Sequence, residues 1–218
     1  MQFDIITIFP KLFDSFLKES LIAKSIQKKV NKIGVHDLRL QSKDKHKQVD
    51  DRPYGGGPGM ILRAEPILCT LKKIKTKNKK KKIKIVLLSP GGKQFDQTMA
   101  QSFAKLDQLI LICGRYEGID ARVNKFIDAQ VSVGPYILSG GELPAMIITE
   151  AVARLQPGYL SNPESLTEES FVGTLSNKAK YPQYTRPEIL KFYGKNLRVP
   201  KILLSGNHAQ IKKWRDKH

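Results

Sequence analysis

Three glycine-bearing segments in this chain each present backbone that a ligand could reach, and the first two follow apolar runs. They read SPGG (Ser89–Gly92), GRYEG (Gly114–Gly118) and SVGPYILSGGELPA (Ser132–Ala145). Glycine allows positive φ and close backbone approach, and proline fixes φ, so such segments form sharp turns with free N–H and C=O groups. We expect these groups to hold a flat, adenine-like heterocycle. The alternative is a set of tight connections that bind nothing.

Two nucleotide-binding loops are excluded by the residues themselves. The segment GGGPGM (Gly55–Met60) lacks the Gly-Lys-Ser/Thr ending of a phosphate loop, and no GxGxxG follows a strand and opens a helix. A ligand held mainly through phosphates is therefore not favoured. The turn at Gly141 is expected to need a backbone conformation that glycine allows. We therefore expect Gly141→Val to abolish ligand binding while leaving the fold intact.

The order of elements around these turns predicts an α/β domain with a largely parallel sheet. In such sheets ligands bind at the carboxyl ends of the strands, where the three glycine segments fall. The long polar segment Arg39–Gly59 is expected to be a functional loop. The expected strands are Phe3–Phe9, Ile33–Leu38, Ile83–Ser89 and Leu109–Cys113, and the expected helical segments are Pro10–Val30, Ala64–Ile74, Asp96–Leu106, Ile119–Ile127 and Gly141–Arg154.

Charge is the strongest compositional feature. The chain of 218 residues carries 38 Lys and Arg against 20 Asp and Glu, a net charge of +18, which favours a polyanionic partner such as nucleic acid. A general bias toward lysine is the alternative, because the run Lys72–Lys84 resembles a solvated connection. The chain shows no apolar run near the ~18 residues of a membrane span and no signal peptide, and Cys69 and Cys113 have no metal-ligand spacing, so we expect a cytoplasmic protein without a metal centre.

The same segments, taken with four others, resemble those of the bacterial tRNA (guanine-N1)-methyltransferases. The match extends over nearly the whole chain, in order. The motifs that carry it are VDDRPYGGGPGM (Val49–Met60), LSPGG (Leu88–Gly92), CGRYEGID (Cys113–Asp120), YILSGGELPA (Tyr136–Ala145), TEESF (Thr167–Phe171), YTRPE (Tyr184–Glu188) and LLSGNHAQIKKWR (Leu203–Arg215).

The resemblance implies methyl transfer from S-adenosylmethionine to N1 of guanosine-37, just 3′ of the tRNA anticodon. It implies a SPOUT-type parallel-sheet domain with a deep C-terminal trefoil knot, followed by a small, mainly helical C-terminal domain. It also implies a homodimer with active sites at the interface, and tRNA rather than DNA as partner. We expect a catalytic domain over 1–155, a flexible linker over 156–174 and a tRNA-binding domain over 175–218. A need for Mg²⁺ is not readable from the sequence.

Site residues follow by motif position. The expected catalytic residues are Glu169, as the base that removes the guanine N1 proton, and Arg154, which would stabilise charge developing on O6. Residues expected to bind substrate are Glu117, Asp50, Arg52, Gly55, Gly59, Ser165 and Arg186. Residues expected to line the cofactor pocket are Leu88, Ser89, Pro90, Gly114, Tyr116, Gly118, Ser132, Val133, Gly134, Tyr136, Leu138, Gly140, Gly141 and Pro144.

The chain departs from the family pattern at three places. Glu169 stands where the family has aspartate, which leaves open whether Glu168 or Glu169 is the base. Pro135 replaces a usual aspartate, and the chain ends at His218, earlier than its relatives. One extra methylene moves a carboxylate by about 1.5 Å, and a misplacement of this order can cost ~100-fold in rate. The alternative function is therefore a catalytically weakened protein that binds S-adenosylmethionine and RNA.

Overall fold

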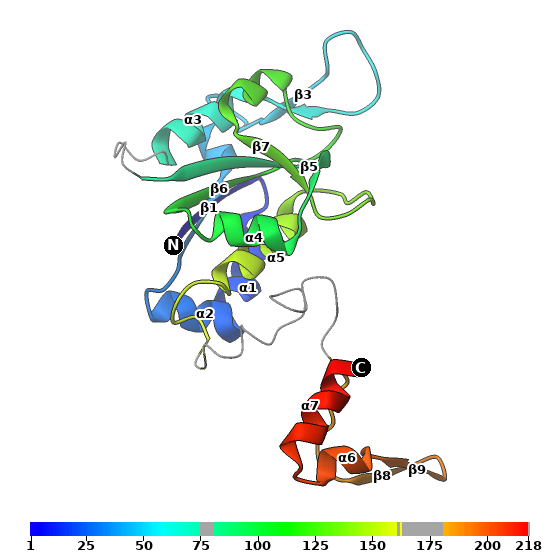
Figure 1. The fold of residues 1–218 in the computed structure, drawn as a ribbon. Helices are drawn as coiled ribbons and strands as arrows, with labels where there is room; N and C mark the ends of the chain where they lie inside the picture. The colour runs from blue at the N-terminus through cyan, green and yellow to red at the C-terminus, as the bar shows by residue number, and fades with distance from the viewer. Residues whose placement is uncertain (75–80, 161, 163–180, 218) are drawn as a thin grey trace. The chain divides into compact units, whose positions relative to one another are not determined.

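The computed structural model describes residues 1–74, 81–160, 162 and 181–217, which form two separate compact units (Figure 1). The first unit is Met1–Pro163 and the second is Glu164–His218. Each unit is described by itself. In the first unit the packed chain continues past the last long helix, because Tyr159 is buried in its core.

A five-stranded, fully parallel sheet forms the centre of the first unit; the sequence predicted a largely parallel sheet and four of these strands, and it missed the strand Ala129–Ser132. The strand order is β2-β1-β6-β5-β7. The strands are β1 (Gln2–Thr7), β2 (Lys32–Asp37), β5 (Ile83–Gln94), β6 (Gln108–Cys113) and β7 (Ala129–Ser132). Every residue of β6 is buried, because this strand is covered on both faces and paired on both edges.

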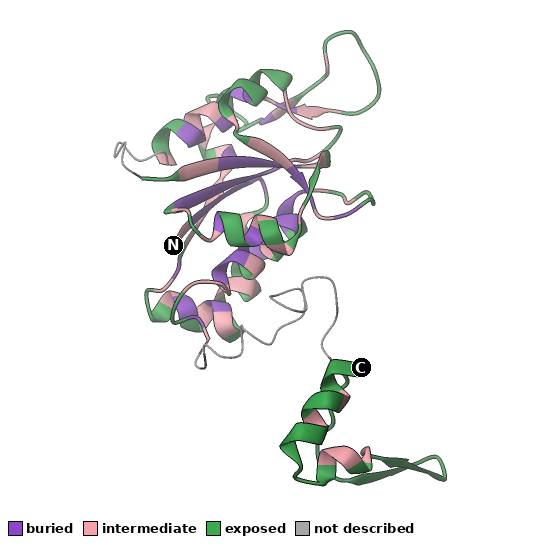
Figure 2. Ribbon diagram, viewed as in Figure 1, coloured by how far each residue is buried: buried purple, intermediate pink, exposed green. Residues whose placement is uncertain are grey.

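Helices cover both faces of the sheet, and alternate residues of the strands point to opposite layers (Figures 1 and 2). Phe3 and Ile5 pack in one buried cluster and Ile6 packs in the other. The helices contributing to the first layer are η1 (Pro10–Phe13), α1 (Asp14–Lys18), α2 (Ser20–Gln27), α4 (Gln97–Phe103) and α5 (Glu142–Ala153). Those of the second are η2 (Leu38–Gln41), α3 (Ala64–Ile74) and η3 (Ala121–Phe126).

Away from the pocket, two predicted segments differ from the structure in their secondary structure. Ile119–Ile127 is not an α-helix: only Ala121–Phe126 is helical, as the 3₁₀ helix η3, whose first turn is capped by the Asp120 side chain accepting from Arg122 N at 2.9 Å. The polar segment Arg39–Gly59 also contains structure. It includes most of η2 and the short strand β3 (Asp50–Asp51), which pairs antiparallel with β4 (Ile61–Leu62).

The described residues of the second unit, 181–217, form two helices and a hairpin; a mainly helical domain was expected, and the hairpin was not. The helices are α6 (Lys201–Leu204) and α7 (His208–Lys217), and the hairpin joins β8 (Ile189–Phe192) to β9 (Lys195–Arg198). Tyr193 and Gly194 form its two-residue turn with φ of 44° and 72°, as a type I′ hairpin requires. The Tyr-Gly pair was the available signal. Among the helices of the described ranges, none is long and apolar enough to cross a membrane.

Candidate cofactor pocket

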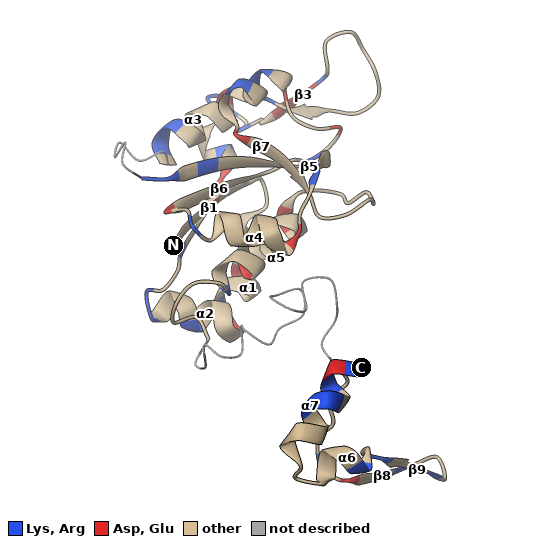
Figure 3. Cartoon of the chain, viewed as in Figure 1, with Lys and Arg blue, Asp and Glu red and all other residues tan. Residues whose placement is uncertain are grey.

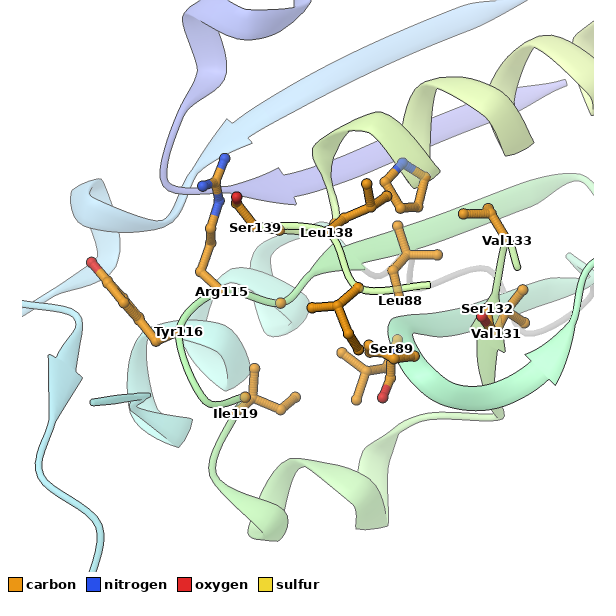
Figure 4. Close-up of a pocket in the computed structure, with 18 of the residues that line it drawn as sticks. Leu88, Ser89, Arg115, Tyr116, Ile119, Val131, Ser132, Val133, Leu138 and Ser139 are labelled. Carbon is orange, nitrogen blue, oxygen red and sulfur yellow. The ribbon is translucent and has the colours of Figure 1, made fainter. Parts of the chain in front are cut away.

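The glycine-rich segments meet in one pocket at the carboxyl ends of β6 and β7 and beside the irregular part of β5 (Figure 4). Its volume is about 310 Å³. All fourteen residues that the sequence analysis assigned to cofactor binding line it, and the assignment to a cofactor itself stays a prediction. The pocket-lining residues that the sequence analysis placed there are Leu88, Ser89, Pro90, Gly114, Tyr116, Gly118, Ser132, Val133, Gly134, Tyr136, Leu138, Gly140, Gly141 and Pro144.

Ser89–Gly92 is not the turn that the sequence suggested. β5 continues through it to Gln94, and its pairing with β7 shifts register between Leu88 and Lys93. A Cβ atom at Gly92 would overlap the backbone of Gln130 and Val131, so glycine is needed there for close approach of two strands. Between Leu88 and Lys93 the regular pairing of β5 with β7 is interrupted, and Ser89 and Pro90 line the pocket there.

Loop Gly114–Gly118 is a true turn, held on both sides. Gly118 N donates to Arg115 O at 3.1 Å, and Tyr116 and Gly118 have φ of 59° and 128°. Positive φ in a residue as bulky as Tyr116 is uncommon and is found where surrounding structure imposes it, often at functional sites. Gly141 N donates to Gly114 O at 2.9 Å, and Glu117 N donates to Met60 O at 3.1 Å. These bonds fix the loop between the start of α5 and the segment before β4.

The turn after β7 is held by its own side chains. Ser132 Oγ donates to Gly134 O at 2.9 Å and accepts from Gly134 N at 3.2 Å. The Tyr136 ring packs on Gly134, where a Cβ atom would overlap it, and the Tyr136 hydroxyl donates to Val133 O at 3.3 Å. Gly134 therefore lets the tyrosine fold back over the turn, and the backbone of this segment is preorganised at the pocket.

Burial also sets the state of Cys113, which ends β6 directly before the pocket. Its thiol is fully buried, and this desolvation, with the nearby Glu142 carboxylate, raises its pKa well above the ordinary value. Cys113 is therefore a neutral packing residue and not a nucleophile.

The residues predicted to bind substrate are only partly brought together. Glu117 lines the pocket and lies against Gly59: a Cβ atom there would come 2.7 Å from Glu117 Cγ. Asp50 lies in β3, and Arg52 and Gly55 are exposed on the following segment; none of these three lines the pocket. Arg186 belongs to the second unit, and Ser165 and Glu169 lie outside the described residues.

Arg154 is at the far end of α5 from the pocket. The pocket includes Gly141, the N-cap of the helix, whereas Arg154 is its C-cap. The 12 residues of α5 span about 18 Å at the helical rise. The structure does not place Arg154 among the pocket-lining residues of its own chain, so the expectation that it faces this pocket is not met within one chain. Its catalytic role stays a prediction.

Several lining residues were not predicted for the pocket. Glu117 was assigned to substrate, and Arg115 follows Gly114 directly, so its position next to a glycine turn was a usable signal. The additional lining residues are Leu87, Arg115, Glu117, Ile119, Val131, Ile137 and Ser139.

Among residues of the described ranges, no three His, Cys, Asp or Glu side chains gather as metal ligands.

Comparison with known proteins identifies the family. The family model for tRNA (Guanine-1)-methyltransferase TrmD matches residues 1–218. The chain belongs to this family. A tRNA (guanine-N(1)-)-methyltransferase from Caldanaerobacter subterraneus subsp. tengcongensis is 46% identical over 215 residues, covering 99% of this chain and 85% of the relative. One from Clostridium novyi is 48% identical, with the same coverage.

A solved structure supports the same assignment at the level of fold. The tRNA (m1G37) methyltransferase from Aquifex aeolicus matches with a TM-score of 0.80 and 35% identity, covering 100% of this chain and 88% of that one. Family membership and this match agree with the α/β domain and parallel central sheet described above.

Proposed function

We propose that the chain transfers a methyl group from S-adenosylmethionine to N1 of guanosine-37 in tRNA, next to the anticodon. The observation that carries this proposal is the single pocket formed by the glycine segments, in a chain whose curated relatives are named tRNA (guanine-N(1)-)-methyltransferases. The position in the tRNA follows the name of the Aquifex aeolicus enzyme.

The pocket residues fit S-adenosylmethionine. A volume of about 310 Å³ lies at the lower end of the ~300–1,000 Å³ usual for small-ligand sites. Leu88, Leu138 and Pro144 supply apolar surface for the faces of adenine, and the backbone at Gly114 and Gly140 offers N–H and C=O groups for its edge. Once bound, the donor supplies a methyl group on a positively charged sulfur, open to attack by a nucleophile.

The chain's own residues would prepare the guanine. Guanine N1 carries a proton at neutral pH and becomes nucleophilic when a carboxylate removes it. We assign this step to Glu169, with its neighbour Glu168 as the other candidate. Glu117, at the pocket, would accept from the exocyclic amino group. Arg154 would stabilise charge on O6, and because it lies far from the pocket of its own chain, this role requires a second copy.

A homodimer is the arrangement that supplies this second copy. Helix α5 buries Ala145, Ile148 and Val152 in the core but leaves Leu143 and Ile147 exposed at 59% and 47%. Exposed apolar residues four apart on one helix face form a surface suited to protein contact. We propose that this face forms the dimer interface.

We also propose the SPOUT-type knot, with the chain around Ser132–Ala145 as the threaded segment.

The RNA partner is favoured by charge. The net charge is +18, and Figure 3 shows Lys and Arg at the end of α3 in the first unit and on α7 in the second. We propose that the second unit, including Arg186 and the α7 residues Lys212, Lys213 and Arg215, binds tRNA phosphates, and that the reaction takes place in the cytoplasm.

One assay tests the proposed function. The purified chain is incubated with S-adenosylmethionine and an unmodified tRNA transcript carrying guanosine-37, and the digested tRNA is analysed by mass spectrometry. We expect 1-methylguanosine at position 37, and none with a transcript carrying adenosine there. Binding of donor and tRNA without methylation would favour the weakened binding protein instead. Parallel reactions with Mg²⁺ and with EDTA establish whether the metal is required.

A further inference from the structure

A buried carboxylate that the proposed reaction does not use lies directly behind the pocket. Glu142 is the first residue of α5, and its side chain is 2% exposed. Its Oε1 accepts from Thr7 Oγ1 at 2.8 Å, and its Oε2 accepts from Arg115 Nε at 2.9 Å. Thr7 Oγ1 in turn accepts from Phe9 N at 2.9 Å. The network thus joins the end of β1, the loop after β6 and the start of α5.

Stability alone does not explain this ion pair. Replacing a buried ion pair by apolar residues of similar volume is often neutral or stabilising, because both charges lose their water. The surroundings are nevertheless shaped around the pair: a Cβ atom at Gly140 would overlap Arg115 Nε and come 2.6 Å from Glu142 Oε2. Because the ion pair leaves no room for a side chain at Gly140, Arg115 is held in a defined position.

Arg115 is fixed at one edge and open at the other. Nε bonds to Glu142, and the guanidinium carbon lies 4.6 Å from the centre of the Phe9 ring. Within the described part of the chain, neither terminal amino group of Arg115 donates a hydrogen bond. The side chain is 20% exposed and lines the pocket. Figure 4 shows Arg115 extending from the loop after β6 toward the chain that follows β1, where Phe9 lies.

The open donors favour an oxyanion. A guanidinium has five N–H donors in a planar fork, and the two terminal amino groups retain four of them for a carboxylate or a phosphate. Arg115 is the only positively charged residue lining the pocket among those described, and Glu117 the only negatively charged one. An anionic group that enters the pocket therefore has one positively charged lining residue available among the described residues.

We infer that Arg115 binds an oxyanion of the substrates at this pocket and that Glu142, held by Thr7, is the positioning residue that orients it. The inference rests on the proposed function for the identity of the substrates. Two sources of the oxyanion are compatible with the geometry: the carboxylate of the methyl donor and a phosphate of the tRNA. Glu142 touches neither and acts through Arg115.

Three variants separate positioning from plain structural support. Arg115→Ala leaves the Glu142 carboxylate buried with one partner fewer, so it should lower both the unfolding temperature and ligand affinity, the latter by about 10- to 100-fold for a charged hydrogen bond. The double variant Arg115→Ala with Glu142→Gln no longer carries the buried, unpaired carboxylate charge. We expect the double variant to regain thermal stability but not affinity. Arg122→Ala is the matched control, since Arg122 also pairs with an aspartate, Asp120, but does not line this pocket.

Glu142→Gln alone should weaken ligand binding less than Arg115→Ala does. The double variant should bind no more weakly than Arg115→Ala, because the two residues act as one unit. If affinity in the double variant recovers together with stability, Glu142 and Arg115 are structural only and the inference is wrong. The inference also fails if Arg115→Ala matches Arg122→Ala for every ligand.

Choice of ligand identifies the oxyanion. Calorimetry compares S-adenosylmethionine with its decarboxylated form, and steady-state kinetics give KM and kcat for tRNA. If the donor carboxylate is bound, Arg115→Ala weakens S-adenosylmethionine but not the decarboxylated form. If a tRNA phosphate is bound, both nucleosides bind as before and KM for tRNA rises. If the wild-type chain binds both substrates but transfers no methyl group, the proposed function is wrong. The inference about Arg115 can still be tested in that case, by comparing the tRNA affinities of the wild type and Arg115→Ala instead of their KM values.

Discussion

Substitution of Gly141 by alanine should damage the pocket and the fold together. A Cβ atom at this position would stand 2.7 Å from Cys113 Cα and 3.0 Å from Gly114 N. Both are backbone atoms, at the end of a fully buried strand, and cannot move aside as a flexible side chain would. The φ of Gly141 is −82°, which any residue adopts, so the demand for glycine is one of space. This corrects the sequence-based expectation that Gly141→Val would spare the fold.

The size of the effect follows from these contacts. Forcing an extra methyl group into packed structure costs about 1–3 kcal/mol. Separation of the two segments also stretches the bond from Gly141 N to Gly114 O, now 2.9 Å, which contributes about 0.5–1.5 kcal/mol. A combined loss of about 2–4 kcal/mol lowers the unfolding temperature of a domain of this size by roughly 5–15 °C.

Gly91→Ala is the matched control. A Cβ atom at Gly91 would have no heavy atom within 4 Å, and Gly91 is not among the residues with positive φ. Thermal unfolding by circular dichroism and calorimetric titration with S-adenosylhomocysteine would be run on both variants. We expect Gly91→Ala to behave as wild type and Gly141→Ala to lose both stability and most of its affinity. Equal melting temperatures and affinities for the two variants would refute the packing argument.

Three further predictions concern the partner, the base and the sheet. The tRNA affinity should fall steeply between low and physiological salt while S-adenosylmethionine affinity hardly changes, as measured by filter binding and calorimetry; a flat salt profile would make the +18 charge a compositional bias. In single-turnover assays, Glu169→Gln should slow transfer by about 100- to 10,000-fold, Glu169→Asp should retain it and Glu168→Gln should be mild; the reverse pattern moves the base to Glu168. Burial would raise the pKa of Asp4, but hydrogen bonds from His36, Gln108 and Gln2 outweigh it and lower the pKa below 3.8. A depressed pKa contributes stability above that value which is lost as pH falls below it, so melting curves at decreasing pH should show an acid loss in wild type that is reduced in Asp4→Asn.

Much of the first unit was determined by local sequence. Apolar runs such as Leu109–Cys113 specify a buried strand by composition alone, and the alternation of strands with amphipathic segments specifies a parallel sheet. Glycine and proline mark the places where regular structure stops, and in a parallel sheet these places gather at one edge. The three glycine segments could therefore be expected at one edge before any contact was known, and the individual pocket residues were named by their positions in the motifs that resemble the family's.

Tertiary structure decided what depends on contacts between distant segments. Sequence does not reveal that β5 passes through Ser89–Gly92, because the register shift depends on how closely β7 approaches Gly92. Sequence also does not pair Glu142 with Thr7, 135 residues away, or with Arg115, 27 residues away. Such pairs form only when separate strands and helices have packed, because a side chain's partner is set by the three-dimensional path of the backbone and not by its neighbours along the chain.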